Sequence, residues 1–340
     1  MWRKPGSFNR NDHLPLNNLF LIGVPDGFEI VAMVVHRNNN GLGYGSETYA
    51  QSLAEFGVPQ HLVGSGGWIL KRPIRRSRFC DAMGIYPFLV CRKWDELRND
   101  IENVEETLIS ICIVTDPLGE YSVEDLRECF PDRMTPFKRH VVIDLRKDWE
   151  SGVCRHHKRN IRKAKNLLTV QRVSSPSQHL DVWAALYSNL VKRHNISGIA
   201  RFSKKSFETQ LRVPGIEAFV ARNNHEPVGM ILWMVHGDIA YYHLGAYSDA
   251  GYENSASFAL FANALEEFSD RGICLANLGA GAGLVTNASD GLTQFKRGWA
   301  KSTRTAYFCG RVCDRDLYDE LVARKENIES EYFPAYRTGD

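Results

Sequence analysis

The stretch from Ile239 to Arg271 constrains the fold most, because it predicts a strand, a loop of small polar residues and a helix in succession. Alternation from Ile239 to Tyr247 is typical of a strand. One predicted face carries Ile239, Tyr241, His243, Gly245 and Tyr247, and the other carries Ala240, Tyr242, Leu244 and Ala246. The helix is indicated by helical spacing of Phe258, Phe261, Leu265 and Phe268, and by a stop at Gly272.

The start of this predicted helix has the composition of an anion site. Asn254 and Ser255 are placed to cap it, and the small residues Ala256 and Ser257 follow. The first amides of a helix lack backbone partners and carry partial positive charge, so this end attracts anions. An ordinary strand-to-helix turn would use the same residues, and the sequence leaves both interpretations open.

Length and composition narrow the class of protein. A chain of 340 residues is longer than one hydrophobic core usually organises, so two domains are predicted. The net charge of +2 means that attraction to a polyanion must come from local patches. The longest apolar run, Val228 to Val235, is too short to span a bilayer, and the first residues lack the apolar core of a signal peptide. The eight cysteines show no metal-ligand spacing, which predicts free thiols in a cytoplasmic protein without a metal site.

Short strands and helices alternate in the first half, which indicates an α/β arrangement. The predicted strands are Leu19–Val24, Glu29–His36, Ile85–Cys91, Leu108–Thr115 and His140–Leu145, and the predicted helices are Glu47–Phe56, Lys93–Glu106 and Ser122–Cys129. The pattern changes near Glu150, so we predict an N-terminal domain at 1–150 and a C-terminal domain at 151–340.

A basic helix is predicted at the start of the second half. No Asp or Glu occurs from Ser151 to Leu180, and the segment RHHKRNIRKAK (155–165) holds six Lys or Arg and two His. Surface helices usually mix charge signs, because opposite charges four residues apart stabilise them and like charges do not. This helix predicts a face for a polyanion, such as a CoA or carrier-protein phosphate, a nucleotide-linked substrate or a tRNA acceptor stem; a merely solvated face is the alternative. The residues concerned are Arg155, Lys158, Arg159 and Arg162.

The remaining elements follow in the order α-α-β-β-β-α-β-α-β. Helices are predicted at His179–His194 and Ser203–Leu211, strands at Glu217–Arg222, Val228–His236, Ile239–Tyr247, Ile273–Leu278 and Thr305–Val312, and a short helix at Gly291–Arg297. The strand from Val228 is apolar on both faces, so we expect it to be central and covered on each side.

Over Ser151–Val312 the chain resembles the GNAT-fold acyltransferases, and more narrowly their FemAB-related branch. The resemblance lies in the basic helix, ARFS (200–203), PVGMILW (227–233), the YYHLGAYS strand, the Leu278-Gly279 strand end and GLTQFKRGW (291–299). It implies an α/β (α+β) fold of two GNAT-like domains, each a mixed, mostly antiparallel sheet flanked by helices. Over the first half the resemblance is architectural only.

The resemblance implies a donor bound where the sheet opens beyond His243, with its anionic part on the next helix N-terminus. The donor-binding residues would be Tyr247, Gly251, Asn254, Ser255, Ala256 and Ser257. The phosphate loop of simple GNAT enzymes, Arg/Gln-x-x-Gly-x-Gly/Ala, is absent between Tyr247 and Ser257. FemAB-like enzymes lack it too, and some of them use aminoacyl-tRNA. The cosubstrate therefore stays open among acyl-CoA, acyl-carrier protein and aminoacyl-tRNA, with no permanently bound cofactor.

Three residues are the candidates for catalysis. His243 could take the proton of an attacking amine, because its ordinary pKa lies near neutrality; a structural histidine is the alternative. Lys296 matches the Phe-Lys of FemAB-like enzymes, where the lysine is implicated in transfer, and a cation there would stabilise developing negative charge; a charge offsetting the helix dipole is the alternative. Tyr241 could donate to a leaving group or simply pack. Arg201 and Arg297 are candidates for binding an anionic substrate.

The function implied is transfer of an acyl or aminoacyl group to an amine of an envelope, polysaccharide or metabolite precursor, with tRNA or acyl-carrier protein as a partner. A non-catalytic RNA- or carrier-binding module on the same scaffold is the alternative. The module would explain the basic helix and the missing phosphate loop together, but it would have no need of Lys296 and a histidine beside a cleft.

Overall fold

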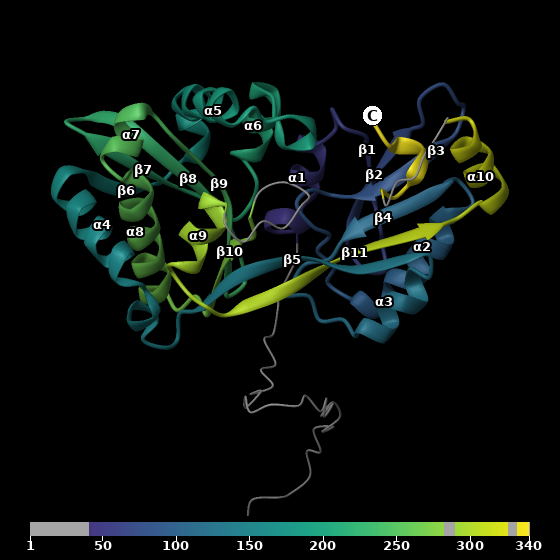
Figure 1. The fold of residues 1–340 in the computed structure, drawn as a ribbon, viewed down its shortest axis with the longest axis horizontal. Coiled ribbons are helices and arrows are strands. Elements are labelled where there is room, and N and C mark those ends of the chain that lie inside the picture. Colours follow the sequence, from purple (N-terminus) through teal and green to yellow (C-terminus); the bar gives the residue numbers. More distant parts are fainter. Residues whose placement is uncertain (1–40, 282–289, 326–331, 340) are drawn as a thin grey trace, which may run out of the picture. The chain divides into compact units, whose positions relative to one another are not determined.

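In the described part of the chain, one sheet of eleven strands organises the fold (Figure 1). The computed structural model describes residues 41–281, 290–325 and 332–339, so the predicted strands Leu19–Val24 and Glu29–His36 lie outside the described residues. The strands are β1 (Val58–His61), β2 (Trp68–Pro73), β3 (Cys80–Gly84), β4 (Ser110–Val114), β5 (Arg133–Asp144), β6 (Thr169–Val173), β7 (Ile216–Asn223), β8 (Glu226–His236), β9 (Ile239–Tyr247), β10 (Leu275–Gly279) and β11 (Thr303–Val312).

Helices cover this sheet on both faces. The α-helices are α1 (Glu47–Ser52), α2 (Leu97–Glu105), α3 (Val123–Cys129), α4 (Arg155–Leu167), α5 (Leu180–His194), α6 (Lys204–Gln210), α7 (Asp249–Glu253), α8 (Ala256–Asp270), α9 (Gly291–Arg297) and α10 (Arg315–Ala323). None of the helices described is long and apolar enough to cross a membrane.

The strand order is β1-β2-β3-β4-β11-β5-β10-β9-β8-β7-β6. The β3–β4 and β9–β10 pairs are parallel, and the other neighbours are antiparallel. The prediction of a mixed, mostly antiparallel sheet flanked by helices is therefore confirmed. The two predicted hairpins are confirmed as well, since Asn223 pairs with Glu226 and His236 with Ile239.

The two halves of the chain exchange their last strands. β11, from the end of the chain, lies between β4 and β5, whereas β5, from the first half, lies between β11 and β10. Figure 1 shows these two long strands crossing the centre of the sheet. The boundary near Glu150 stays a prediction, and the sheet runs without interruption across the two segments that it would separate.

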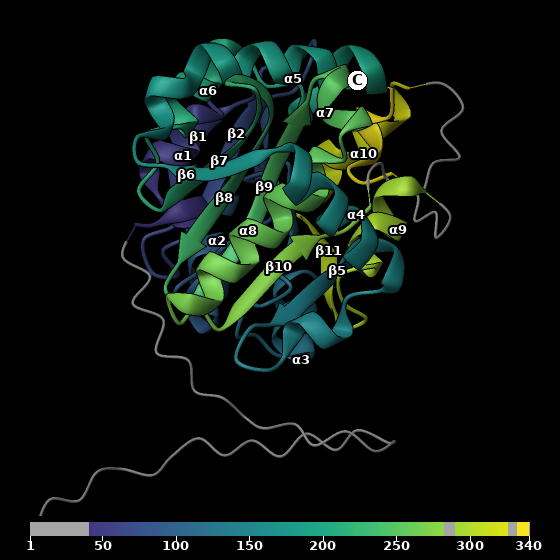
Figure 2. The same cartoon turned by 90° about the vertical axis from the view of Figure 1, so that its left-hand side faces the viewer.

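The second half has a hydrophobic cluster on each side of its strands. On one side α5 packs on β8 and β9, with α6 beside it. On the other side α8 packs on β7, β8 and β9, and α4 packs on α8. In Figure 2, α8 lies across these strands with α4 and α9 nearby. β8 is buried from Val228 to His236, so the predicted central strand is confirmed.

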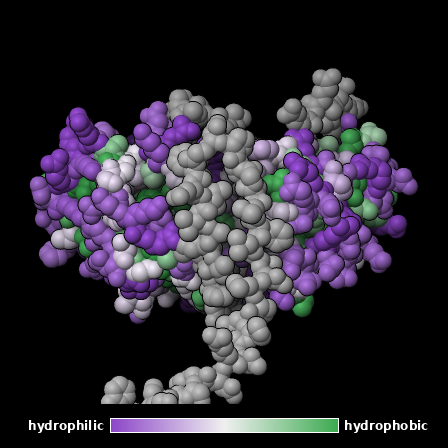
Figure 3. All heavy atoms as spheres, turned by 90° about the horizontal axis from the view of Figure 1, so that it is seen from below, coloured by the Kyte–Doolittle hydropathy of each residue, from purple (hydrophilic) through white to green (hydrophobic). Residues whose placement is uncertain are grey.

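The view in Figure 3 shows a described surface that is mostly hydrophilic, with small and separate apolar areas. Large exposed hydrophobic side chains in the described part are scattered along the chain, at Val58, Val63, Leu167, Leu292 and Tyr332.

Several elements of the sequence prediction are wrong. Residues 85–91 form no strand and contain only an isolated bridge from Leu89 to Thr115; the strand there is β3, which ends at Gly84. The short strands β1, β2 and β6 and the helix α10 were not predicted. Short strands of four to six residues such as β1, β2 and β6 present too few alternating positions for a periodic signal.

A tight joint fixes the basic helix α4 to α9. The backbone N–H of Cys154, which precedes α4, donates to the Gly298 carbonyl at 2.9 Å. His157 Nε2 donates to the Phe295 carbonyl at 2.7 Å, and its ring packs between the Phe258, Phe295 and Trp299 rings. A Cβ at Gly298 would overlap the His157 ring. The joint therefore depends on glycine for space.

We expect Gly298→Ala to lower the free energy of unfolding by about 1–3 kcal/mol, because the methyl group would push His157 out of the joint. Gly298 has φ −70°, which alanine adopts without strain, so the effect isolates the overlap. Gly291→Ala is the matched control, since a Cβ there meets nothing within 4 Å. Urea unfolding measures both variants, and equal stability would show that α4 and α9 are not rigidly joined.

Candidate active site

The sheet opens between β9 and β10. These parallel strands pair at three positions, the last of which joins Tyr241 to Asn277. Beyond it β9 continues along β8 to Tyr247, whereas β10 follows β5 to Gly279. In the described part of the chain, β9 therefore has no partner strand on this edge from Tyr242 to Tyr247. The sequence predicts an opening beyond His243, and the structure starts it at Tyr241.

A β-bulge lies at the same place in β9. Leu232 of β8 pairs with Leu244 and Trp233 pairs with Tyr242, so His243 is an extra residue in its strand. An extra residue reverses the faces to which the following side chains point, and bulges commonly occur beside active sites.

The bulge overturns the prediction that the odd-numbered residues of β9 share one face. Tyr241 and His243 contact the cluster on the α5 and α6 side. Tyr242 and Tyr247 belong to the cluster under α8. A Cβ on Gly245 would lie 2.8 Å from the Tyr247 hydroxyl. Tyr247 is 8% exposed, so this donor-binding candidate is a buried residue.

His243 has the contacts of a structural histidine. The Gln210 side-chain amide donates to Ser206 at 3.0 Å, which turns its oxygen toward His243 Nε2, also at 3.0 Å. Nε2–H therefore donates to Gln210, and Nδ1 accepts from the Tyr44 hydroxyl at 3.0 Å. Burial lowers the pKa of His243 to about 3. Its lone pair is occupied, so the general-base hypothesis for His243 loses its geometric support.

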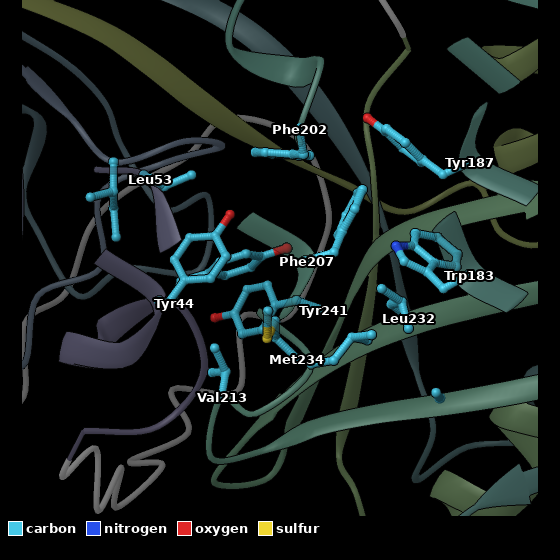
Figure 4. Close-up of a cluster of buried hydrophobic side chains, with 14 of the residues drawn as sticks. Tyr44, Leu53, Trp183, Tyr187, Phe202, Phe207, Val213, Leu232, Met234 and Tyr241 are labelled. Carbon is cyan, nitrogen blue, oxygen red and sulfur yellow. The ribbon is translucent and has the colours of Figure 1, made fainter. Parts of the chain in front are cut away.

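Tyr241 is likewise engaged within the core. Its hydroxyl donates to the buried Asp116 carboxylate at 2.9 Å. Its ring packs against Tyr44 and Phe88 in the cluster drawn in Figure 4. This geometry favours the packing interpretation of Tyr241 over donation to a leaving group.

The segment after β9 is a short helix, α7, where the sequence predicted a loop. Ser248 caps α7, because its hydroxyl accepts from the Gly251 N–H at 3.2 Å. A Cβ on Gly251 would overlap the Val228 carbonyl oxygen. The glycine is therefore needed for packing α7 against β8, and its backbone N–H is already bonded within the helix.

The two residues predicted to cap α8, Asn254 and Ser255, do not cap it with their side chains. Asn254 ends α7 as its C-cap. Ser255 stands at the N-cap of α8 in a left-handed conformation (φ 58°) and its side chain makes no capping bond. Ala256 is buried and Ser257 is half-buried. The start of α8 as the site of the donor's anion stays a prediction.

Lys296 lies in the interior, on α9. This helix begins after Asp290, whose carboxylate caps it by accepting from the Thr293 N–H at 2.8 Å. Lys296 is 5% exposed although it is charged in its ordinary state. Lys296 stands in the last turn of α9, so the alternative of a charge that offsets the helix dipole stays open, but its burial sets it apart from an ordinary surface charge.

The Lys296 amine is held at the end of β10. Its Nζ donates to the Ala280 carbonyl at 2.6 Å and lies 5.5 Å from the centroid of the Tyr242 ring. A Cβ on Gly279 would come within 3.0 Å of Nζ. The amine thus lies beside the first residue of β9 that lacks a β10 partner.

The environment of Lys296 shifts its acidity. Burial lowers the pKa of Lys296 to about 7; Asp290 opposes this shift and Lys138 adds to it. At neutral pH the amine is therefore close to half protonated, which suits a group that must hold or move a proton.

Two polar residues that the sequence analysis did not select lie next to Lys296. His140 on β5 is within 3.2 Å of the Asn277 side-chain oxygen on β10. Burial lowers the pKa of His140 to about 4, and the charge of Lys296 lowers it further in the same direction. His140 falls within a predicted strand, but only the pairing of β5 with β10 shows that it reaches this corner.

The basic face of α4 is exposed. Arg155, Lys158, Arg159 and Arg162 form no ion pair with any acidic residue in the described ranges, and with His156 they line a shallow pocket of about 440 Å³. Lys165, on the same helix, pairs with Glu266 at 2.5 Å. Arg201 and Arg297 are also exposed.

The structure places His243 and Tyr241 in the cluster on the α5 and α6 side, whereas Lys296 contacts the Tyr242 ring. The joint described above links α4 to the helix of Lys296.

Comparison with known proteins agrees with this geometry. Residues 152–297 match the family model of the acetyltransferase (GNAT) domain. They form a GNAT domain. The match confirms the predicted superfamily for this segment of the chain. A search of curated proteins gave no match.

The solved structures show the same fold over most of the chain. FemX matches with a TM-score of 0.61 and 14% identity, over 84% of this chain and 95% of FemX. The C-terminal domain of an Agrobacterium fabrum protein described as a lysylphosphatidylglycerol synthetase matches with a TM-score of 0.54 and 15% identity, over 81% and 91%. A Bacteroides thetaiotaomicron protein of unknown function matches with a TM-score of 0.53 and 13% identity, over 82% and 93%. The FemAB-type fold is therefore confirmed across both halves.

We expect His243→Phe to lower the free energy of unfolding by roughly 2 kcal/mol or more, because it leaves the Tyr44 hydroxyl and the Gln210 oxygen buried without partners. Transfer per folded molecule should stay within about threefold of wild type, since no catalytic bond is lost. Thermal unfolding and single-turnover rates measure the two effects. A stable variant with a loss of transfer of about 100-fold or more would restore the base role.

Proposed function

We propose that this protein moves an acyl or aminoacyl group from an activated donor to the amine of an acceptor, with Lys296 supporting the leaving group. The acceptor is the amine of an envelope, polysaccharide or metabolite precursor. The observation that carries the proposal is the buried Lys296 amine at the place where β9 and β10 separate.

The chemistry needs a charged group at this point. The neutral amine of the acceptor attacks the carbonyl carbon of the donor, a C–N bond forms, and the C–O or C–S bond to the leaving group breaks. The leaving oxygen or sulfur gains negative charge, and one proton from the attacking nitrogen must finally reach it. A protonated Lys296 stabilises that charge and can supply the proton, because its pKa of about 7 lets it regain the proton from the amine.

The surface of α4 supports aminoacyl-tRNA as the donor. Its basic side chains lack acidic partners among the described residues, so they remain available to phosphates. Gly251 packs on β8 and α7 replaces a phosphate loop, so the segment after β9 offers less to the diphosphate of a CoA. Acyl-CoA and acyl-carrier protein are the competing donors. Single-turnover assays with each of the three donors discriminate among them.

A binding module without catalysis is less well supported. It would use α4 in the same way, but it would gain nothing from a buried lysine. A buried amine costs stability unless it is well paired, and Lys296 has a backbone carbonyl and no carboxylate within 4.0 Å in the described part of the chain. Such a cost is typical of functional sites. Binding of tRNA without turnover of any donor would favour the module.

We expect Lys296→Met to abolish transfer and to raise stability. The folded-state pKa of Lys296 lies below its ordinary value of 10.5, so folding disfavours the ammonium form. The resulting loss of folding stability is largest below about pH 7. It becomes smaller as pH rises toward the pKa of the lysine in the unfolded chain. At pH 6 the variant should therefore unfold with a free energy higher by about 1–4 kcal/mol. Full activity of the variant would remove Lys296 from the mechanism.

Lys296→Arg is the control for charge. In wild type, the transfer rate divided by the neutral fraction of the acceptor amine should decline as pH rises through about 7, because the protonated fraction of Lys296 falls. An arginine stays protonated, so any remaining transfer by this variant should lack that decline. A wild-type rate that, divided in the same way, rises steadily from pH 7 to 9 would contradict the ammonium role and favour the neutral amine as a base.

We expect Arg159→Gln to weaken tRNA binding. The slope of log K against the logarithm of the salt concentration should become shallower by about one, because one fewer counterion is released on binding. Filter binding over a salt series measures this. Lys165→Gln is the matched control on the same helix, because Lys165 is already paired with Glu266. Equal effects of the two substitutions would show that the exposed face of α4 is not the binding face.

A further inference from the structure

The side-chain amide of Asn277 is an unsatisfied hydrogen-bond donor in the interior. Asn277 is 1% exposed, and its Nδ2 has no hydrogen-bond partner among the residues that the structure describes. Buried amide groups almost always have partners, because an unmade bond costs free energy. The indole nitrogens of Trp183, Trp233 and Trp299 also lack partners within the described ranges, but those rings pack within hydrophobic clusters.

The orientation of this amide is fixed by its surroundings. The backbone N–H of Gly279 points at the Asn277 side chain at 2.8 Å, and an N–H can donate only to the oxygen of the amide. His140 Nδ1 lies 3.2 Å from the same oxygen and donates to it. Because both bonds hold Oδ1, Nδ2 must point away from them.

Asn277 lies where β9 and β10 separate, close to the proposed catalytic residue Lys296. It forms the last pair between β9 and β10, opposite Tyr241, at the point where the strands separate. Gly279, two residues further along β10, adopts φ +77°, and a Cβ on it would lie 3.0 Å from Lys296 Nζ. The Asn277 amide and the Lys296 amine therefore flank the same glycine.

We infer that Asn277 Nδ2 donates a hydrogen bond to the carbonyl oxygen of the group being transferred. The inference rests on the proposed function and adds a second group to it. When the amine attacks, the electron pair of the carbonyl moves onto its oxygen, and a fixed N–H donor stabilises that oxygen in the tetrahedral intermediate. Asn277 acts on the carbonyl oxygen, and Lys296 acts on the leaving atom. His140 is a positioning residue, because it holds the amide and does not touch the substrate.

The test compares Asn277→Asp and Asn277→Ala with wild type. The aspartate keeps an oxygen for Gly279 and His140 and replaces the N–H donor by a second oxygen that can carry negative charge, whereas the alanine removes the whole amide without adding charge. We expect both variants to lose about 100- to 1000-fold in single-turnover rate. His140→Leu is the control, because Asn277 stays held by Gly279, and its loss should be below about tenfold.

A spectroscopic measurement separates this role from a structural one. The probe is an amide-linked analogue of aminoacyl-tRNA labelled with ¹³C at its carbonyl, bound to each protein. In wild type the carbonyl stretch should shift to lower frequency relative to the free analogue, and in both Asn277 variants this shift should be lost.

These measurements distinguish failure of the proposed transfer activity from failure of the role of Asn277 alone. No turnover by wild type with any of the three donors overturns the proposed function and this inference with it. Turnover by wild type together with wild-type rates in both Asn277 variants, or an unchanged carbonyl band, overturns the role of Asn277 alone. Loss of stability without loss of rate per folded molecule has the same meaning.

Discussion

The structure depends on the separation of β9 from β10 after a single short run of paired residues. Backbone N–H and C=O groups in the interior need partners, and β9 has none on this edge from Tyr242 onward among the described strands. The bulge at His243 turns the following side chains over, so that Tyr247 joins Tyr242 in the cluster under α8, and the Tyr242 ring there lies near Lys296. Lys296 and Asn277 both lie beside Gly279 at the end of β10, where the two strands separate.

Burial gives Lys296 its distinctive chemistry. A lysine in water is a permanent cation at neutral pH, but removal from water lowers its pKa to about 7. The same burial strengthens any electrostatic interaction with a reacting group, because the local dielectric constant is low. The joint between α4 and α9 couples this residue to the exposed basic surface, so one rigid unit would bind an anionic donor and act on its reactive end.

The exchange of β5 and β11 ties the two halves together. Each half contributes a strand that completes the other half's part of the sheet, and β5 also brings His140 to the corner where β10 ends. The N-terminal half therefore contributes side chains to the surroundings of Lys296 rather than acting as a separate module. Tyr44 and Asp116, also from this half, hold His243 and Tyr241 in the cluster on the α5 and α6 side.

The sequence by itself determined the elements whose periodic patterns are long. The hairpins through β7, β8 and β9, the helices α4, α5 and α8, and the bounds of α9 all follow from spacing and turn residues, and the motif around Lys296 pointed to the correct superfamily. Short edge strands and the bulge left no periodic signal, so the faces of β9 were assigned wrongly. Only the tertiary structure decided that His243 has both ring nitrogens bonded, that Lys296 is buried, and that Asn277 and His140 lie beside it. The physical reason is that pKa values and free hydrogen-bonding groups depend on contacts between residues more than a hundred positions apart.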